Sequence, residues 1–156
     1  MLFRSLLAIA LFAVCCCSQW IEDTSVGSPQ YWSSVASSAD GTKLVAAARR
    51  WTYGPQYDGN LWTSTEAGGS WTSLGISRDW NSIASSANGT KLVAGSPIYT
   101  STDSGGSWTS KTQNSHFSDC ASSADGTTLL AGQQGGRLWI STDSGGSWTE
   151  ITSVEK

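Results

Sequence analysis

An eight-residue phrase occurs three times in this chain, and its spacing limits the folds that the chain can adopt. Its copies occupy residues 64–71, 101–108 and 141–148. Each copy ends in Gly-Gly-Ser-Trp, and the closing residues Trp71, Trp108 and Trp148 stand 37 and 40 residues apart. A fixed period near 40 residues is typical of repeated supersecondary units. The phrase therefore predicts a repeat architecture rather than one irregular domain.

A second phrase precedes each copy of the first and predicts a tight hairpin. It occupies residues 35–46, 83–94 and 120–131. At its centre stand the pairs Asp40-Gly41, Asn88-Gly89 and Asp125-Gly126. Asp-Gly and Asn-Gly supply the positive φ angles that a two-residue hairpin turn needs. The flanks are short and β-prone, so each repeat is expected to begin with two antiparallel strands.

The rest of each repeat predicts a second hairpin, in which the eight-residue phrase is the turn. The strand before this turn is expected at residues 60–64, 98–101 and 137–141. The carboxylate at the third position of the phrase can accept backbone N–H groups of the turn. The tryptophan begins the fourth strand and is expected to turn its ring into the core between repeats. Glu66 replaces aspartate in the first copy, and its extra methylene makes this bond less favourable, so the first turn should be the loosest.

These elements predict an all-β protein of β-propeller-type repeats, because four short antiparallel strands are the content of one propeller blade. Three blades are expected at about residues 31–75, 80–112 and 117–154. Residues 19–26 resemble a fourth strand without its own blade. Propellers have at least four blades, so three copies predict an incomplete ring or a ring completed by a homo-oligomer. An open stack and a fragmentary gene product are the alternatives.

The pattern Ser-x-Asp-x-Gly-x-x-Trp resembles the Asp-box, or bacterial neuraminidase repeat. Residues 101–108 and 141–148 match it fully, and residues 64–71 match it apart from Glu66. The resemblance implies a β-propeller of the kind shared by sialidases, some endoglucanases, sortilin-like receptors and Ycf48-type photosystem II assembly factors. It also implies that the box is a folding element at the blade periphery, away from the ligand-binding face. Structural roles are therefore expected for Glu66, Trp71, Asp103, Trp108, Asp143 and Trp148.

Residues 1–18 have the composition of a secretory signal peptide. Arg4 supplies the positive charge, residues 5–14 are apolar, and small residues precede an expected cut near Gln19. The apolar run is too short to span a bilayer comfortably. We therefore expect a secreted protein that does not span a membrane after cleavage, with residues 19–156 as a single repeat domain. A retained N-terminal anchor and a lipoprotein are the alternatives.

Charge and cysteine content exclude other classes of protein. Residues 19–156 hold 8 basic and 12 acidic residues and no basic run, so nucleic acid is not an expected partner. Cys120 is the one cysteine beyond residue 18, which leaves no internal disulfide framework. It aligns with Val35 and Ile83, so we expect a buried, unreactive thiol.

Asn88-Gly89-Thr90 is a sequon for N-glycosylation. A glycan on Asn88 would fit a secretory route. The same three residues are also an ordinary hairpin turn, so the sequon can be accidental. The sequence therefore marks Asn88 as a candidate glycosylation site.

The ionisable residues do not form a recognisable catalytic set. A sialidase needs clustered arginines, a tyrosine nucleophile helped by a glutamate, and an acid/base carboxylate, and nothing in the sequence places such residues together. Other glycosidases need two facing carboxylates. Asp79 and Asp119 are the best acids that no turn explains, and both are expected to be solvated loop acids. His116 is the one histidine, so neither a metal site nor another cofactor is expected, and no catalytic residue is assigned.

One segment breaks the repeat. Asp40 and Asn88 stand 48 residues apart, whereas Asn88 and Asp125 stand 37 apart. The extra residues fall at 49–59, between the second and third strands of the first unit. Long loops on a rigid scaffold often carry function. This loop is therefore the expected place for a binding site.

The loop residues suit recognition of a sugar or a protein, because arginines and aromatic rings dominate such sites. The candidates are Arg49, Arg50, Trp51, Tyr53 and Tyr57. An extended hairpin whose rings cover a neighbouring blade is the alternative. The sequence thus favours a secreted, non-enzymatic module that binds a glycan or an extracellular protein. A Ycf48-like structural or assembly factor and a degenerate, sialidase-like glycoside hydrolase are the other hypotheses.

Overall fold

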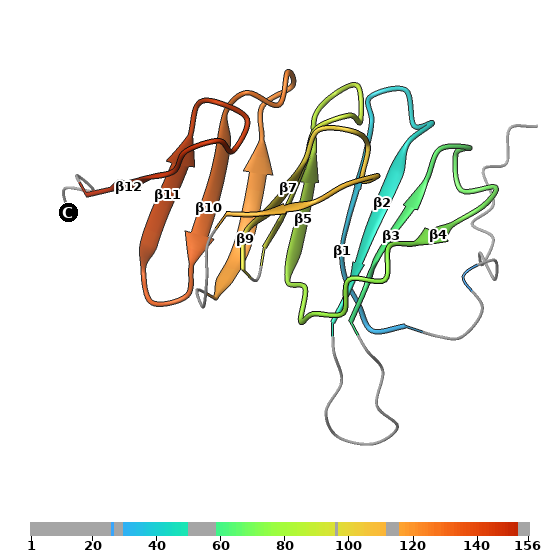
Figure 1. The fold of residues 1–156 in the computed structure, drawn as a ribbon, viewed down its shortest axis with the longest axis horizontal. Helices are drawn as coiled ribbons and strands as arrows, with labels where there is room; N and C mark the ends of the chain where they lie inside the picture. The colour runs from blue at the N-terminus through green and yellow to red at the C-terminus, as the bar shows by residue number, and fades with distance from the viewer. Residues whose placement is uncertain (1–25, 27–29, 50–58, 96, 112–115, 153–156) are drawn as a thin grey trace, which may run out of the picture.

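A computed structural model describes residues 26, 30–49, 59–95, 97–111 and 116–152 of the chain. Their strands form three four-stranded antiparallel sheets, which lie side by side (Figure 1). Within these ranges no helix is long and apolar enough to cross a membrane. The predictions of an all-β chain and of three four-stranded units are confirmed. The expected signal peptide, and the extra N-terminal strand apart from Val26, lie outside the described residues.

Each sheet is one repeat in chain order, and we call the three sheets the first, second and third blade. The first blade comprises β1 (Trp32–Ser37), β2 (Leu44–Ala48), β3 (Leu61–Ser64) and β4 (Thr72–Ser73). The second comprises β5 (Ser82–Ser85), β6 (Leu92–Gly95), β7 (Tyr99–Ser101) and β8 (Thr109–Ser110). The third comprises β9 (Phe117–Ser122), β10 (Leu129–Gln133), β11 (Arg137–Ser141) and β12 (Thr149–Ile151). Strands that follow one another in a blade pair antiparallel.

The first hairpin of each blade has its Asp-Gly or Asn-Gly pair in the turn, and the glycine has a positive φ as predicted. The predicted two-residue length is wrong, because six residues lie between the last paired residues of each hairpin. In the first blade the pairing runs to Ser37 opposite Leu44, and Asp40 fills the turn between them. The Asp40 carboxylate accepts hydrogen bonds from Thr42 N–H at 3.0 Å and from the Ser38 hydroxyl at 2.6 Å. These bonds lower the pKa of Asp40 to about 2, the Ser38 hydroxyl contributing most. A local network thus sets the register of β1 and β2.

The fourth strands begin one residue later than expected. The sequence predicts that the tryptophan of the phrase opens the strand, but β8 begins at Thr109. Trp108 still belongs to the turn, because its indole Nε1–H donates to the carbonyl of Gly105 at 3.1 Å. The ring is held by this bond while the backbone completes the turn.

The hydrophobic core lies between the blades rather than within any one of them. Between the first and second blades it consists of Val45, Ala47, Leu61, Trp80, Ile83, Leu92 and Ala94. Between the second and third blades it consists of Val93, Ile98, Phe117, Leu129 and Ala131. The blades therefore stack face to face, and the second blade buries apolar side chains on both of its sides.

The innermost strands β1, β5 and β9 are neighbours in space, and backbone hydrogen bonds join the turns that follow them. The amide of Ala39 donates to the carbonyl of Ala87 at 2.7 Å, and the amide of Ala87 donates to the carbonyl of Ala124 at 2.7 Å. One bond thus repeats at equivalent positions from blade to blade. It holds the three sheets in register along an arc.

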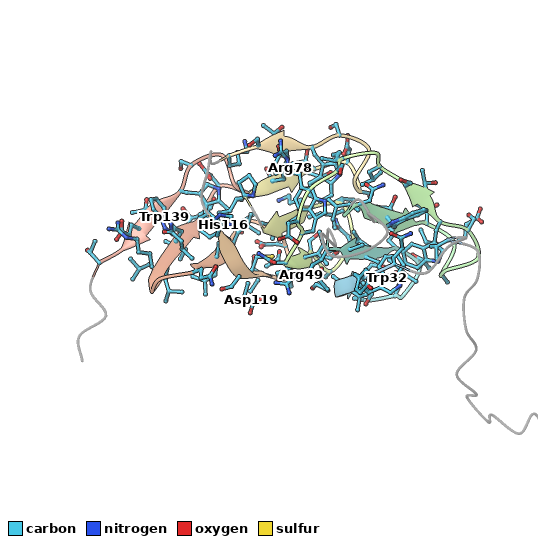
Figure 2. The ribbon with its side chains drawn as sticks, turned by 90° about the horizontal axis from the view of Figure 1, so that it is seen from below. Trp32, Arg49, Arg78, His116, Asp119 and Trp139 are labelled. Carbon is cyan, nitrogen blue, oxygen red and sulfur yellow. The ribbon has the colours of Figure 1, made fainter. Side chains whose placement is uncertain are left out.

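The strand ends form two opposite faces, which we name by what they carry. The turn face carries the first hairpin turns and the eight-residue phrases, and these are bonded within a blade, as where Ser104 N–H donates to the carbonyl of Thr90 at 2.9 Å. The loop face carries the β2–β3 loop, its counterparts and the links from blade to blade. Figure 2 looks onto the loop face, with the arc of the three blades seen end-on.

Candidate binding face

The carboxylates of the turn face are fully used in holding turns. Asp103 accepts hydrogen bonds from the Ser107 hydroxyl at 2.6 Å, from Ser107 N–H at 2.8 Å and from the Ser101 hydroxyl at 2.8 Å. These bonds lower the pKa of Asp103 to about 2, the Ser107 hydroxyl contributing most. Asp143 has the same three kinds of partner in the third blade, and its pKa is also lowered to about 2. Carboxylates bound in this way are poor candidates for acid/base chemistry.

The first phrase is bonded differently, because Glu66 stands where the others have aspartate. Its carboxylate accepts a hydrogen bond from the Ser70 hydroxyl at 3.0 Å. Among the described residues, neither the Ser70 amide nor the Ser64 hydroxyl donates to it, although the equivalent groups donate to Asp103. The first turn thus holds fewer internal bonds than the other two.

The three phrase tryptophans differ in their surroundings. Trp108 packs against the core between the first and second blades, and Trp148 packs against the core between the second and third. The Nε1–H of Trp148 is buried without a hydrogen-bond partner in the described structure. Trp71 is half-buried. The rings of Trp108 and Trp148 are therefore committed to packing between the blades.

On the loop face, a chain of hydrogen bonds crosses all three blades. The Arg49 guanidinium donates to the Asn81 side-chain oxygen at 2.6 and 3.1 Å. The Asn81 amide donates in turn to the carbonyl of Phe117 at 2.9 Å. The sequence marks Arg49 as a ligand-binding candidate. In the structure Arg49 is exposed (Figure 2), and its side chain also links the first blade to Asn81 at the start of the second.

Four of the five candidate ligand residues, Arg50, Trp51, Tyr53 and Tyr57, lie outside the described residues. The structure does show where their loop leaves the scaffold. The amide of its first stem residue, Arg49, donates a hydrogen bond to the carbonyl of Tyr31 at 2.8 Å. Its last, Gly59, is buried and accepts a hydrogen bond from Arg78 N–H at 2.9 Å. Both stems are thus fixed on the loop face.

A stacked cation stands near the second stem. The guanidinium of Arg78 lies 5.3 Å from the centre of the Tyr99 ring. That ring meets Trp80 edge-on at a centroid distance of 5.3 Å, and Trp80 itself is bonded through Nε1–H to the carbonyl of Ile76 at 3.0 Å. Arg78 is exposed, so its charge is available above a rigid aromatic base. Sequence reasoning missed this platform, because no spacing rule links Arg78 to Tyr99.

The described arginines do not converge on one substrate carboxylate. Arg49 is bonded to Asn81, and Arg78 is stacked on Tyr99. Arg137 forms an ion pair with Glu150 at 2.7 Å. Each of the three arginines therefore serves a different partner.

The two unassigned acids differ from each other. Asp79 is exposed, as expected for a loop acid. Asp119 is not a loop residue: it lies within β9, where its carboxylate accepts hydrogen bonds from the Ser82 hydroxyl at 2.8 Å and from Cys120 N–H at 2.9 Å. The expected loop position is therefore wrong for Asp119, whose side chain is exposed but stands on an inner strand and bonds one blade to the next. Figure 2 shows Asp119 on the inner-strand side of the arc.

Cys120 and His116 are the remaining described side chains that could react with a ligand or hold a metal. Burial raises the pKa of the Cys120 thiol to about 12, and the thiol donates to the carbonyl of Val93 at 3.4 Å. His116 is exposed at the edge of the loop face. Within the described part of the chain, no three His, Cys, Asp or Glu residues gather closely enough to hold a metal ion.

The candidate glycosylation residue Asn88 is exposed on the turn face. Its side-chain oxygen accepts hydrogen bonds from Thr90 N–H at 3.0 Å and from the Ser86 hydroxyl at 2.9 Å. It therefore fills the same turn as Asp40 and Asp125 do in the other blades.

Taken together, three antiparallel sheets with adjacent inner strands and cores between sheets define an arc of a β-propeller.

No family model matches the sequence, and no curated protein matches it. Solved structures do match. YCF48 bound to a D1 peptide has a TM-score of 0.60 and 14% identity. The GH74 xyloglucanase of Xanthomonas campestris has a TM-score of 0.64 and 16% identity, and the GH74 enzyme of Niastella koreensis 0.55 and 26%.

The matches cover most of this chain but a minor part of those proteins. They span 78%, 81% and 76% of this chain, against 40%, 24% and 17% of YCF48 and of the two GH74 enzymes. The chain thus spans less than half the length of each. The likeness shows the β-propeller fold, which both enzymes and a peptide-binding protein share, and fold alone does not fix function.

Proposed function

We propose that this chain is a secreted, non-enzymatic propeller protein that binds an extracellular protein or a glycan through its loop face. The observation that carries the proposal is the contrast between the two faces. On the turn face the carboxylates accept hydrogen bonds from their own turns, as Asp103 does. The loop face presents the exposed cations Arg49 and Arg78 on fixed supports. The stem residues of the long loop, Arg49 and Gly59, are fixed on the same face.

The chemistry of this face favours a partner with carboxylates and flat apolar groups. Arginine forms paired hydrogen bonds with carboxylates and stacks on planar groups. Arg50, Trp51, Tyr53 and Tyr57 would add a further cation and three rings from the loop. An acidic, extended peptide or an acidic glycan has both features. YCF48, a propeller of similar fold, is bound to a peptide, which supports the protein-binding form of the proposal.

The test is capture on arrays of peptides and glycans that include acidic members. Arg50→Ala and Trp51→Ala should each abolish capture, while the midpoint of urea denaturation stays unchanged. Thr65→Ala changes an exposed residue of the turn face and serves as the matched control. Capture that survives both loop substitutions would remove the loop from the proposal.

The same arrays separate the second candidate, a structural or assembly factor of the Ycf48 type. The similarity to YCF48 at a TM-score of 0.60 favours it. It predicts capture of peptides alone, with no glycan retained. Capture of glycans alone would exclude it and leave the glycan-binding form.

A degenerate glycoside hydrolase is the third candidate, supported by the structural likeness to GH74 enzymes. The separate partners of Arg49, Arg78 and Arg137 speak against a sialidase site. We expect no turnover of a fluorogenic sialoside or of a glucan by the pure protein. Measurable turnover of either would overturn the non-enzymatic proposal.

Secretion and glycosylation are tested on protein recovered from the medium of a eukaryotic host. We expect a mature chain that begins at Gln19 and a loss of mass on enzymatic removal of N-glycans. Asn88→Gln should abolish that loss of mass. An N-terminus at Met1 in cell-bound protein would favour the retained anchor instead.

A further inference from the structure

The two ends of the arc leave apolar surfaces uncovered. We call the side of a blade that faces the preceding blade its leading face, and the opposite side its trailing face. On the leading face of the second blade, Trp80 is 0% exposed and Ile83 is 4% exposed. The residues at the same repeat positions in the first blade, Trp32 and Val35, are 43% and 72% exposed.

The trailing faces show the same contrast at the other end. Leu61 in the first blade and Ile98 in the second are both 0% exposed. Their counterpart in the third blade, Leu138, is 38% exposed, and so is Leu130, the counterpart of the buried Val93. The arc of described blades thus ends in a leading face at one side and a trailing face at the other.

These two faces have the shapes that already pack together twice within the chain. At the first junction, Val45 and Leu61 of a trailing face cover Trp80 and Ile83 of a leading face. The second junction repeats it with Val93 and Ile98 against Phe117 and the half-buried Cys120. The exposed side chains Leu130 and Leu138 occupy the positions that cover a leading face at both junctions. They could cover the exposed leading face formed by Trp32 and Val35 in the same way.

The leading face of the first blade is also preassembled. Trp32 meets Trp62 edge-on, with ring centroids 6.5 Å apart at 70°. In the second blade, Trp80 meets Tyr99 in the same way, at 5.3 Å and 79°, and there the pair is covered by the first blade. In the pair of the first blade, Trp62 is half-buried and Trp32 is the exposed member.

We propose that a second copy of this chain covers both ends. The trailing face of the third blade in each copy packs on the leading face of the first blade in the other, which closes a six-bladed ring. Propellers have four to eight blades, and two copies of the three blades that the structure describes give six, which lies in that range. Two identical head-to-tail interfaces then close around a twofold axis, without the open polymer that a non-closing contact would give.

Differences between the repeats suit the third trailing face to a contact between chains. Lys43 and Lys91 occupy one position in the first two blades, where the third blade has Thr128. At another position Thr63 and Thr100 are replaced by Ile140. The third trailing face therefore carries one cation fewer and one aliphatic side chain more than the faces buried inside the chain. Loss of charge and gain of apolar surface mark the centre of an obligate interface.

The backbone supplies a further matching pair. Ala39 and Ala87 each donate an amide hydrogen bond to the next blade, to Ala87 and to Ala124 respectively. Ala124 N–H has no acceptor within the described residues, and no described donor reaches the carbonyl of Ala39. In the ring, Ala124 of one copy donates to Ala39 of the other.

The first test is the mass of the secreted full chain by sedimentation velocity, where we expect twice the mass of one chain. Val35→Glu and Leu138→Glu each place a charge in the interface and should weaken association by at least about 100-fold, so that single chains appear. Thr72→Glu adds the same charge at an exposed site of β4 and should leave the dimer intact. A single chain for the unsubstituted protein would overturn the proposal, and would assign the end faces to the N-terminal segment or to other blades.

A cysteine pair tests the arrangement of the two chains. Cysteines at Ala39 and Ala124, with Cys15, Cys16 and Cys17 changed to serine, should cross-link on oxidation into dimers and no larger species. Ala39→Cys with Ala87→Cys is the matched control, because these residues are bonded within one chain and should give a cross-linked monomer. A ladder of larger species would show an open stack, and a cross-linked monomer from the first pair would show that the ends of one chain meet. Either result would contradict the closed dimer.

Discussion

The first and second blades have the same strands and the same turns, yet their equivalent residues meet different surroundings. Trp80 is buried, whereas its counterpart Trp32 is 43% exposed. Gly89 is packed against the first blade, whereas nothing lies near the Cβ position of Gly41. Asp103 is held by three kinds of bond, whereas Glu66 accepts one. The comparison teaches that a neighbouring blade decides the contribution of residues such as Trp80 and Gly89, whereas a single departure from the motif decides that of Glu66.

The largest expected effect is at the paired tryptophans. Trp80→Ala removes a fully buried ring and should lower the free energy of unfolding by about 3–5 kcal/mol. Trp32→Ala should cost about 1 kcal/mol, since much of its ring stays in water. Both are measured by urea denaturation in a Leu138→Glu background, which keeps the end faces free of a second copy. Equal losses would mean that the first leading face is covered within a single chain.

The paired turn glycines come next. A Cβ at Gly89 would lie 2.9 Å from Lys43 Cβ and 3.1 Å from Ser38 Cβ. Gly89 and Gly41 have φ angles of +68° and +72°. Alanine at either site should therefore lower the free energy of unfolding by about 1–2 kcal/mol, because its side chain disfavours the left-handed backbone. Overpacking should add about 1–3 kcal/mol at Gly89 alone. Thermal unfolding of the two variants checks this, and a larger loss at Gly41 would contradict the packing difference.

The turn carboxylates should make stability depend on pH. The pKa of Asp103 is lowered from 3.8 to about 2 by its hydrogen bonds, so its stabilisation is complete well above pH 3.8 and is lost as the pH falls through about 2. At pH 7, Asp103→Asn should therefore lower the melting temperature more than Glu66→Gln does. Near pH 2 the two variants should no longer differ. A pH-independent difference would show that the charge of Asp103 is not what holds the turn.

The smallest expected effect is a gain. Glu66→Asp gives the first phrase the residue that the second and third phrases have. The shorter side chain can accept the Ser70 amide as Asp103 accepts that of Ser107, which should raise the melting temperature by about 2–4 °C. Asp103→Glu is the reciprocal control and should lower it by a similar amount. No change in either variant would mean that these turns tolerate both lengths.

The sequence predicts most of the fold because turn chemistry is local. Asp40 and Gly41 close a hairpin with partners no more than two residues from Asp40. The contacts of the loop face could not be predicted in this way. Arg49 meets Asn81, and Asn81 meets Phe117, across separations of 32 and 36 residues. Such pairs depend on how one sheet sits against the next, and no periodicity in the chain encodes that.

The same limit explains Asp119. Its neighbours in sequence suggest a loop acid, and its hydrogen-bond partner Ser82 lies 37 residues away. Alignment of the repeats offers a signal, since Ser34 and Ser82 occupy the equivalent inner-strand positions and each accepts an amide of the next blade. A residue type alone does not reveal that role, but its position in the repeat does.

The bonds that run from Ala39 to Ala87 and from Ala87 to Ala124 connect adjacent blades only. In a single chain the second blade is therefore clamped on two sides and each outer blade on one. Local unfolding should therefore begin in the first and third blades and reach the second blade last. Amide protons of β5 and β6 should accordingly exchange with solvent more slowly than their counterparts in β1 and β10, and closure into a ring would remove that gradient.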